Sequence, residues 1–183
     1  MPDDLDAPFA SADLMASRSS GAITKESHPF LEDELQAATR AIREFCRWHV
    51  APTLQRTYRS ASRTPDDVYL PASQLVSIDA VTIDGREFTP EACAAVEFDP
   101  LTGWTNLYGR RVTVTYTAGH AEVPADIVGA TLEIAAAGLG TSLGQSREQA
   151  GAVSLTFDTV GGGVDPQAAL GRRLVPYQIG RLP

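Results

Sequence analysis

Residues 112–127 read VTVTYTAGHAEVPADI, and this stretch decides the fold. Its first six residues alternate between Val or Tyr and Thr, which is the period-two pattern of a strand rich in β-branched and aromatic residues. Gly119 then marks a turn, and Pro124 followed by Asp126 is typical of a helix start. The sequence therefore predicts a strand that leads within a few residues into a helix.

This helix is predicted to span residues 124–139. Glycines at positions 138 and 140 end it. Gly129 and several alanines give this helix a surface of small side chains, so another helix can approach it closely. Its apolar side is expected to consist of Ile127, Val128, Leu132, Ala135 and Leu139.

An earlier helix is predicted over residues 29–50, with Pro29 at its first position and Pro52 beyond its end. Acidic residues 32–34 lie in the first turn, where the helix dipole favours them. At 1.5 Å per residue this helix is roughly 30 Å long. Its apolar stripe has helical spacing and consists of Leu31, Leu35, Ala38, Ile42, Phe45 and His49.

Between the two helices, residues 68–117 have the pattern of antiparallel strands. An alternating run over residues 76–83 meets Asp84-Gly85, a dipeptide that favours a tight hairpin turn, and residues 86–89 are expected to return as its partner. A further strand is predicted over residues 94–98. These features predict an α+β protein with a small antiparallel sheet inserted into a helical bundle.

The two ends of the chain are predicted to be arms around a core of residues 29–160. Residues 1–28 show no sustained period and indicate an N-terminal extension, mobile unless a partner orders it. After a loop over residues 145–150 and a strand over residues 153–157, the C-terminal arm spans residues 161–183. It begins with three glycines, and Asp165 can cap a short helix from Pro166.

The composition excludes several classes of protein. The chain has 183 residues and a net charge of −8. Its hydrophobic fraction of 43% is too high, and its charged fraction of 21% too ordinary, for a wholly disordered chain. Its apolar runs are too short for a membrane helix, its start lacks a secretory pattern, and Cys46 and Cys93 are too few for a disulfide scaffold. We therefore expect a soluble protein of intracellular type that neither spans a membrane nor binds DNA tightly.

No motif in the sequence indicates catalysis. Residues 140–144 match the Gly-x-Ser-x-Gly pattern, but that motif requires a preceding strand and a later histidine, whereas a helix precedes it here and the last histidine is His120. The three histidines lack metal-type spacing, and His49 and Cys46 are expected to pack in the core. We expect no enzyme activity, no cofactor and no metal, with a hydrolase centred on Ser142 as a remote alternative.

The C-terminal tail has features of a docking segment. Its apolar residues lie where no regular element is predicted to shelter them, and each contributes roughly 1.5–3 kcal/mol if fully buried. The tail can fold back on its own domain or dock onto a partner, and we favour the partner. These residues are Leu174, Val175, Tyr177, Ile179 and Leu182.

The order of these elements resembles a known family. A striped helix, a hairpin-rich insertion, the strand–turn–helix stretch from Tyr116 to Ile127 and an arginine-bearing arm are similar to the head–tail connector proteins of long-tailed bacteriophages. These proteins, also called adaptor or head-completion proteins, have relatives in gene transfer agents. The resemblance covers roughly residues 29–183, and its most specific part is residues 116–127.

The resemblance implies a structural role in the virion neck, with assembly in the host cytoplasm. Such proteins form a ring, usually a dodecamer, that binds the portal and a neck or tail-completion protein and extends the DNA channel without binding DNA specifically. On this basis the candidate portal contacts are Arg172, Arg173, Leu174, Val175, Pro176, Tyr177 and Ile179.

Charge offers candidate contacts between neighbouring subunits. A ring needs two different patches on each subunit. Residues 27–64 carry six arginines and four acids, whereas residues 65–123 carry nine acids and three arginines, so these regions are complementary. The candidate interface residues, expected mainly on a solvated helix face, are Arg40, Arg43, Arg47, Arg56 and Arg59.

A second hypothesis is a stand-alone module that binds a small ligand or peptide through the β insertion. It predicts a pocket lined by Trp104, Tyr108 and Tyr116 and no self-assembly.

Overall fold

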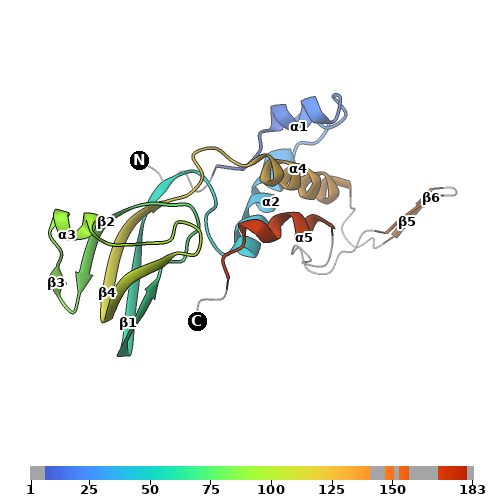
Figure 1. Ribbon diagram of the computed structural model, residues 1–183. Coiled ribbons are helices and arrows are strands. Elements are labelled where there is room, and N and C mark those ends of the chain that lie inside the picture. The colour runs from blue at the N-terminus through green and yellow to red at the C-terminus, as the bar shows by residue number, and fades with distance from the viewer. Residues whose placement is uncertain (1–6, 141–146, 151–152, 157–168, 181–183) are drawn as a thin grey trace. The chain divides into compact units, whose positions relative to one another are not determined.

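The computed structural model describes residues 7–140, 147–150, 153–156 and 169–180. It has an α+β fold, as predicted, and the chain divides into two compact units. The helical unit comprises Met1–Phe45 and Pro124–Pro176, and the sheet unit comprises Cys46–Val123 and Tyr177–Pro183. Figure 1 labels the helices and strands of both units.

The helical unit is built from α1 (Ala12–Arg18), α2 (Leu31–Cys46), α4 (Ala125–Gly140) and α5 (Ala169–Leu174). The two long helices confirm the predictions over residues 29–50 and 124–139, with shifted ends. α2 ends at Cys46, before the predicted boundary, because Arg47 adopts a left-handed φ of 66°. His49, expected on the helix stripe, therefore lies beyond the helix.

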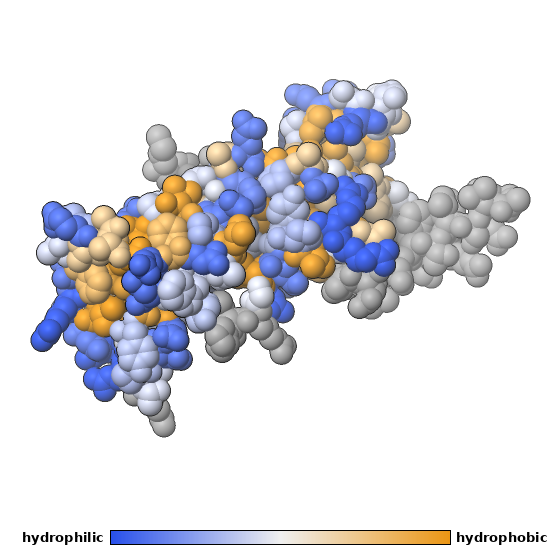
Figure 2. All heavy atoms as spheres, in the orientation of Figure 1, coloured by the Kyte–Doolittle hydropathy of each residue, from blue (hydrophilic) through white to orange (hydrophobic). Residues whose placement is uncertain are grey.

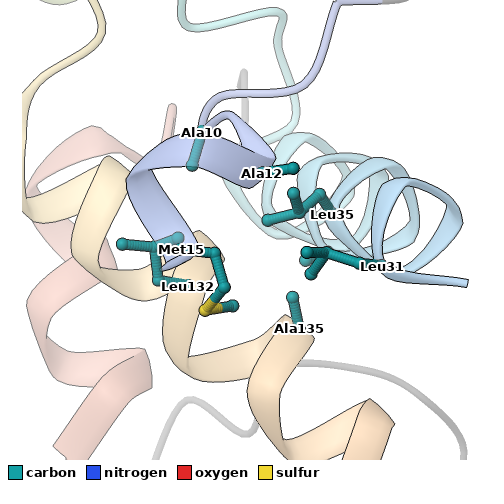
Figure 3. Close-up of a cluster of buried hydrophobic side chains, with 8 residues drawn as sticks. Ala10, Ala12, Met15, Leu31, Leu35, Leu132 and Ala135 are labelled. Carbon is teal, nitrogen blue, oxygen red and sulfur yellow. The ribbon is translucent and has the colours of Figure 1, made fainter. Parts of the chain in front are cut away.

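The core of the helical unit lies between α1, α2 and α4 (Figure 3). In this view Leu132 of α4 points toward α1, and Met15 of α1 lies between Leu132 and the two leucines of α2, Leu31 and Leu35. The first turns of α2 therefore bury their apolar stripe as predicted, with Leu31 and Leu35 essentially inaccessible to solvent. The buried members are Ala10, Ala12, Met15, Leu31, Leu35, Ala38, Leu132 and Ala135.

The prediction of an N-terminal extension over residues 1–28 is wrong for its described part. Ser11 caps α1 by accepting a hydrogen bond from the amide of Leu14, and Met15 is 3% exposed. The amide of Phe9 donates to the buried hydroxyl of Thr39 on α2 at 2.9 Å. This segment was missed because α1 has seven residues, too few to show a helical period.

The small residues of α4 accept close neighbours, as predicted. A Cβ atom at Gly129 would lie 2.9 Å from a guanidinium nitrogen of Arg173 on α5, and one at Gly138 would collide with the carboxylate of Glu34 on α2. Glycine at these positions therefore makes room for charged side chains from the neighbouring helices.

The sheet unit contains a four-stranded antiparallel sheet in the order β1-β4-β2-β3 (Figure 1). Its strands are β1 (Leu54–Tyr69), β2 (Leu75–Ile83), β3 (Arg86–Glu87) and β4 (Trp104–Ala118). The hairpin between β2 and β3 turns at Asp84 and Gly85, whose φ angles of 51° and 84° confirm the predicted tight turn.

Two predictions about the insertion are wrong. The sheet begins at Leu54 rather than residue 68, because β1 carries polar and basic residues and lacks an apolar alternation. The strand predicted over residues 94–98 is replaced by α3 (Pro90–Ala94), which Thr89 caps, and by a single bridge between Phe98 and Thr105.

The central strand β4 buries one face. Val112, Val114 and Tyr116 are at most 3% exposed, and the threonines between them face outward. Arg110 and Arg111 are both exposed, so the alternation shifts by one residue there. The partner strand shows a register shift at the same level, between Ala61 and Asp66.

A separate hairpin pairs β5 (Arg147–Ala150) with β6 (Val153–Thr156). The strand predicted over residues 153–157 is confirmed over its described part, whereas the loop predicted over residues 145–150 is wrong for β5. The predicted joint at residues 161–163 and the cap at Asp165 lie outside the described residues. In the part of the chain that the structure describes, no helix has the length and apolar character of a membrane span.

Asp79 connects three strands on the outer face of the sheet. Its carboxylate accepts hydrogen bonds from Ser77 at 2.6 Å, from Thr117 of β4 at 2.8 Å and from Gln55 of β1 at 3.0 Å. Partial desolvation raises the pKa of Asp79, but the three hydrogen bonds lower it by more, so the pKa lies below its ordinary value.

This carboxylate makes stability depend on pH. Because the folded pKa of Asp79 lies below the unfolded one, its contribution is complete above the unfolded value of about 4 and is lost as pH falls through the folded value. The effect is expected to stay below about 1 kcal/mol because the group is exposed. Urea unfolding from pH 7 to pH 2.5 should show this loss in the natural chain and not in Asp79→Asn. Equal acid profiles would contradict the prediction.

Candidate interaction surfaces

The first part of the C-terminal arm belongs to the helical unit. Helix α5 buries Leu174 completely. Its neighbour Arg173 forms an ion pair with Glu133 of α4 at 2.7 Å, over the space that Gly129 leaves open. The ion pair therefore joins α5 to α4, and the burial of Leu174 places this part of the arm in the helical unit.

The second part of the arm binds to the sheet unit. The indole N–H of Trp48 donates to the carbonyl of Tyr177 at 2.7 Å, and the amide of Ile179 donates to the carbonyl of Cys46 at 3.1 Å. The ring of Tyr177 meets His120 edge-on, with 5.9 Å between ring centroids. We call the site formed by Cys46, Trp48 and His120 the tail seat.

Backbone geometry at the end of β4 shapes the tail seat. Gly119 has a φ of 120°, and a Cβ atom there would lie 2.5 Å from the carbonyl oxygen of Pro52. Next to it, Nε2 of His49 lies 2.9 Å from the carbonyl of Ala118, and the amide of His120 donates to Val50 at 2.9 Å. These contacts bring the ring of His120 near that of Trp48, with 6.1 Å between ring centroids, and burial lowers the pKa of His120.

The tail seat gives a direct prediction for Trp48→Phe. The variant keeps an aromatic ring but removes the N–H donor, so the carbonyl of Tyr177 loses its partner, at an expected cost of about 1 kcal/mol. Hydrogen exchange should show faster exchange of the Ile179 amide. Trp104→Phe, which changes the other tryptophan of the chain, should leave that amide unaffected. Unchanged exchange in Trp48→Phe would show that this bond does not hold the tail.

The predicted portal contacts include both exposed and buried residues. Arg172, Arg173, Val175 and Pro176 are exposed, whereas Tyr177 and Ile179 are half-buried and Leu174 is fully buried. The expectation that no regular element shelters the tail is therefore wrong for Leu174, Tyr177 and Ile179, because α5 and the tail seat cover them. Leu182 lies outside the described residues.

The candidate interface arginines do not form one helix face. Arg40 and Arg43 lie on α2 of the helical unit, where the guanidinium of Arg43 stacks over the ring of Phe9 at 4.7 Å. Arg47 follows α2, and Arg56 and Arg59 lie on β1 of the sheet unit. The expectation of a mainly helical basic face is wrong, because residues 54–69 form a strand.

Large apolar side chains are exposed on both units. On the helical unit, Phe30 precedes α2 with 69% of its surface exposed. On the sheet unit, the exposed members are Val76, Leu101, Trp104 and Tyr108. Figure 2 shows apolar patches interrupted by hydrophilic residues across the visible face.

The pocket predicted from Trp104, Tyr108 and Tyr116 does not form. Tyr116 is 3% exposed in the core, whereas Tyr108 is 60% exposed on the opposite face of β4. The shift in alternation at Arg110 and Arg111 separates the aromatic residues. The three aromatic residues therefore do not line one pocket, which the binding-module hypothesis required.

Both cysteines and His49 are buried in the structure. Cys46 is fully buried, as predicted, and burial raises its pKa to about 12, so its thiol stays protonated. Cys93, expected in a loop with possible exposure, is instead buried in α3. His49 packs in the core as expected. Among the described residues no group of three or more His, Cys, Asp or Glu side chains could hold a metal ion. Ser142 lies outside the described residues.

No protein-family model matches the chain, and no curated protein sequence does. Among solved structures, the chain is similar to one described as the neck of a native GTA particle computed with C12 symmetry. The identity is 17% and the TM-score 0.49, over 91% of this chain and 89% of the other.

The sequence located only part of these surfaces. Apolar character singles out Leu174, Val175, Tyr177, Ile179 and Leu182. Of these, the structure buries Leu174 and half-buries Tyr177 and Ile179 against the chain itself, whereas Val175 is exposed. Trp48 was missed because it lies off the apolar stripe of the first helix, and its partner Tyr177 is 129 positions away. A local signal existed at Gly119-His120, where a glycine directly follows the clearest strand.

Proposed function

We propose that this chain is a structural subunit of a head–tail connector ring, which lies between the portal and the tail and extends the DNA channel. The observation that carries the proposal is the order of its elements. A long helix, an antiparallel sheet, a second long helix and a C-terminal arm with exposed arginines follow one another in the order that the resemblance implies. The proposed location is the virion neck, and no catalytic activity is proposed.

The surface supports a ring of identical subunits. A head-to-tail contact requires two unlike patches on each copy. The helical unit presents Phe30 beside the exposed acids Glu32 and Asp33, and the sheet unit presents Tyr108 near Arg110. The two patches differ in their residues and both contain an exposed aromatic ring, so they meet the requirement for unlike surfaces on one subunit.

The exposed part of the arm is the proposed portal contact. Arg172, Val175 and Pro176 present charge and apolar surface without any change in the arm, whereas Leu174 is withdrawn into the helical unit. We therefore restrict the portal contact to the exposed residues. The net charge of −8 suits a channel wall that DNA must pass without binding.

The test combines the purified chain with the portal ring encoded in the same gene neighbourhood. Light scattering and electron microscopy should show a second ring on the portal, dodecameric if the resemblance holds in full. The double variant Arg172→Glu/Val175→Asp should weaken this binding, and Arg18→Glu, an exposed change on α1, should not. Failure to bind the portal, or the absence of a portal gene nearby, would overturn the proposal.

A further inference from the structure

Strand β1 forms a long open edge of the sheet. It has 16 residues and lies at one end of the strand order, whereas the other end is β3, which has two. In the described part of the chain no strand pairs with the outer edge of β1. Alternate residues of β1 therefore direct their N–H and C=O groups away from β4, and such an edge is a template for another strand.

The regular half of this edge is basic. Residues 54–61 pair with β4 without interruption, and the register shifts only beyond Ala61. Arg56 and Arg59 are both exposed, and the segment contains no acid. Because Arg56 is opposite the buried Tyr116 and Arg59 is opposite the outward-facing Thr113, the two arginines lie on opposite faces of the sheet.

The chain contains a short segment with the complementary charge and spacing. Residues 1–6 read MPDDLD, with Asp3 and Asp6 three positions apart, the same separation as Arg56 and Arg59. In an antiparallel register with Asp3 opposite Arg59, Asp6 lies opposite Arg56 and Leu5 lies opposite Thr57. Residues opposite each other share a face, so one carboxylate meets one guanidinium on each side of the sheet.

We propose that the outer edge of β1 accepts residues 3–7 of a second copy of this chain as an added antiparallel strand. The main chain supplies the hydrogen bonds and the two Asp–Arg pairs set the register. The donor segment starts from a fixed point, because Phe9 is bound to Thr39 and Arg43. The contact joins unlike surfaces of two copies and can therefore repeat from copy to copy.

This inference concerns self-association and does not depend on the virion role. A chain that pairs in this way and ignores portal rings would refute the proposed function alone. A chain that binds portal rings without this pairing would refute the present inference alone.

Cysteine cross-linking between differently tagged chains tests the register. One chain carries Leu5→Cys and the other Thr57→Cys, and the mixture is treated with an oxidant. Antiparallel partners bring Cα atoms within about 4.5–5.5 Å, which a disulfide can span. The natural cysteines are both buried. We expect a cross-linked heterodimer with Thr57→Cys and none with Ala80→Cys, an exposed position on β2 of the same sheet.

Charge exchange tests the two ion pairs. Reversal of the donor, Asp3→Lys/Asp6→Lys, should reduce cross-linking about tenfold, because both attractive pairs are lost and the reversed charges repel the arginines. Combining it with Arg56→Glu/Arg59→Glu on the acceptor should restore the yield. Cross-linking at Ala80 as strong as at Thr57, no cross-link between chains, or a yield unaffected by charge reversal would each overturn the inference.

Discussion

Replacing Gly119 by alanine is expected to destabilise the sheet unit by about 3 kcal/mol or more. The φ of 120° is unfavourable for any residue with a Cβ atom, which costs of the order of 1–3 kcal/mol. The new Cβ would also lie 2.5 Å from the carbonyl oxygen of Pro52 and 2.7 Å from Nε2 of His49. Neither the backbone oxygen nor the buried ring can move without disturbing the tail seat. Urea unfolding, followed by tryptophan fluorescence, measures the loss.

Gly85→Ala is the matched control for this variant. Gly85 also has a positive φ, 84°, but a Cβ atom there would meet nothing within 4 Å. Its substitution should lower the free energy of unfolding only by the cost of a positive φ for alanine, about 1 kcal/mol. The difference between the two variants isolates the close approach at Gly119. Equal losses would show that the end of β4 relaxes and that His120 is not held as described.

Local patterns in the sequence predicted the elements whose own residues carry a period. The strand over residues 112–117, the turn at Asp84-Gly85 and the helix starting near residue 124 were correctly identified because alternation, a turn dipeptide and a proline each act over a few residues. The helix end at Cys46 was not predicted, since the left-handed φ of Arg47 has no signature in the residue type.

The features that failed depend on partners distant in the sequence. β1 forms because β4 supplies its hydrogen bonds, and its polar sequence shows no buried face of its own. The N-terminal segment folds because α2 and α4 provide a surface for Met15 and because Thr39 accepts the amide of Phe9. A single sequence contains no direct record of such pairings, so a short helix or a polar strand appears as an extension or a loop.

The candidate site shows the same limit. Apolar composition singles out the C-terminal tail, but composition cannot distinguish burial against the chain itself from burial against a partner. The structure separates the two at adjacent positions, because Leu174 is buried and Val175 is 48% exposed.

Truncation of that buried residue, Leu174→Ala, is the second change with a large expected effect. A fully buried leucine reduced to alanine typically costs 2–5 kcal/mol, and we expect about 3 kcal/mol here because Leu174 has no exposed surface. In a chain of this size each kcal/mol lowers the melting temperature by about 2–4 °C. Thermal unfolding of the variant beside the natural chain measures this loss.

Val175→Ala, one position further along, should change stability by less than about 0.5 kcal/mol because that side chain is half-exposed. The two variants also separate structure from binding: Val175→Ala should weaken portal binding without loss of stability, whereas Leu174→Ala should lose stability first. A Leu174→Ala chain that is stable but fails to bind the portal would contradict this separation. It would indicate that Leu174 itself contacts the portal and leaves its buried position in the isolated chain on binding.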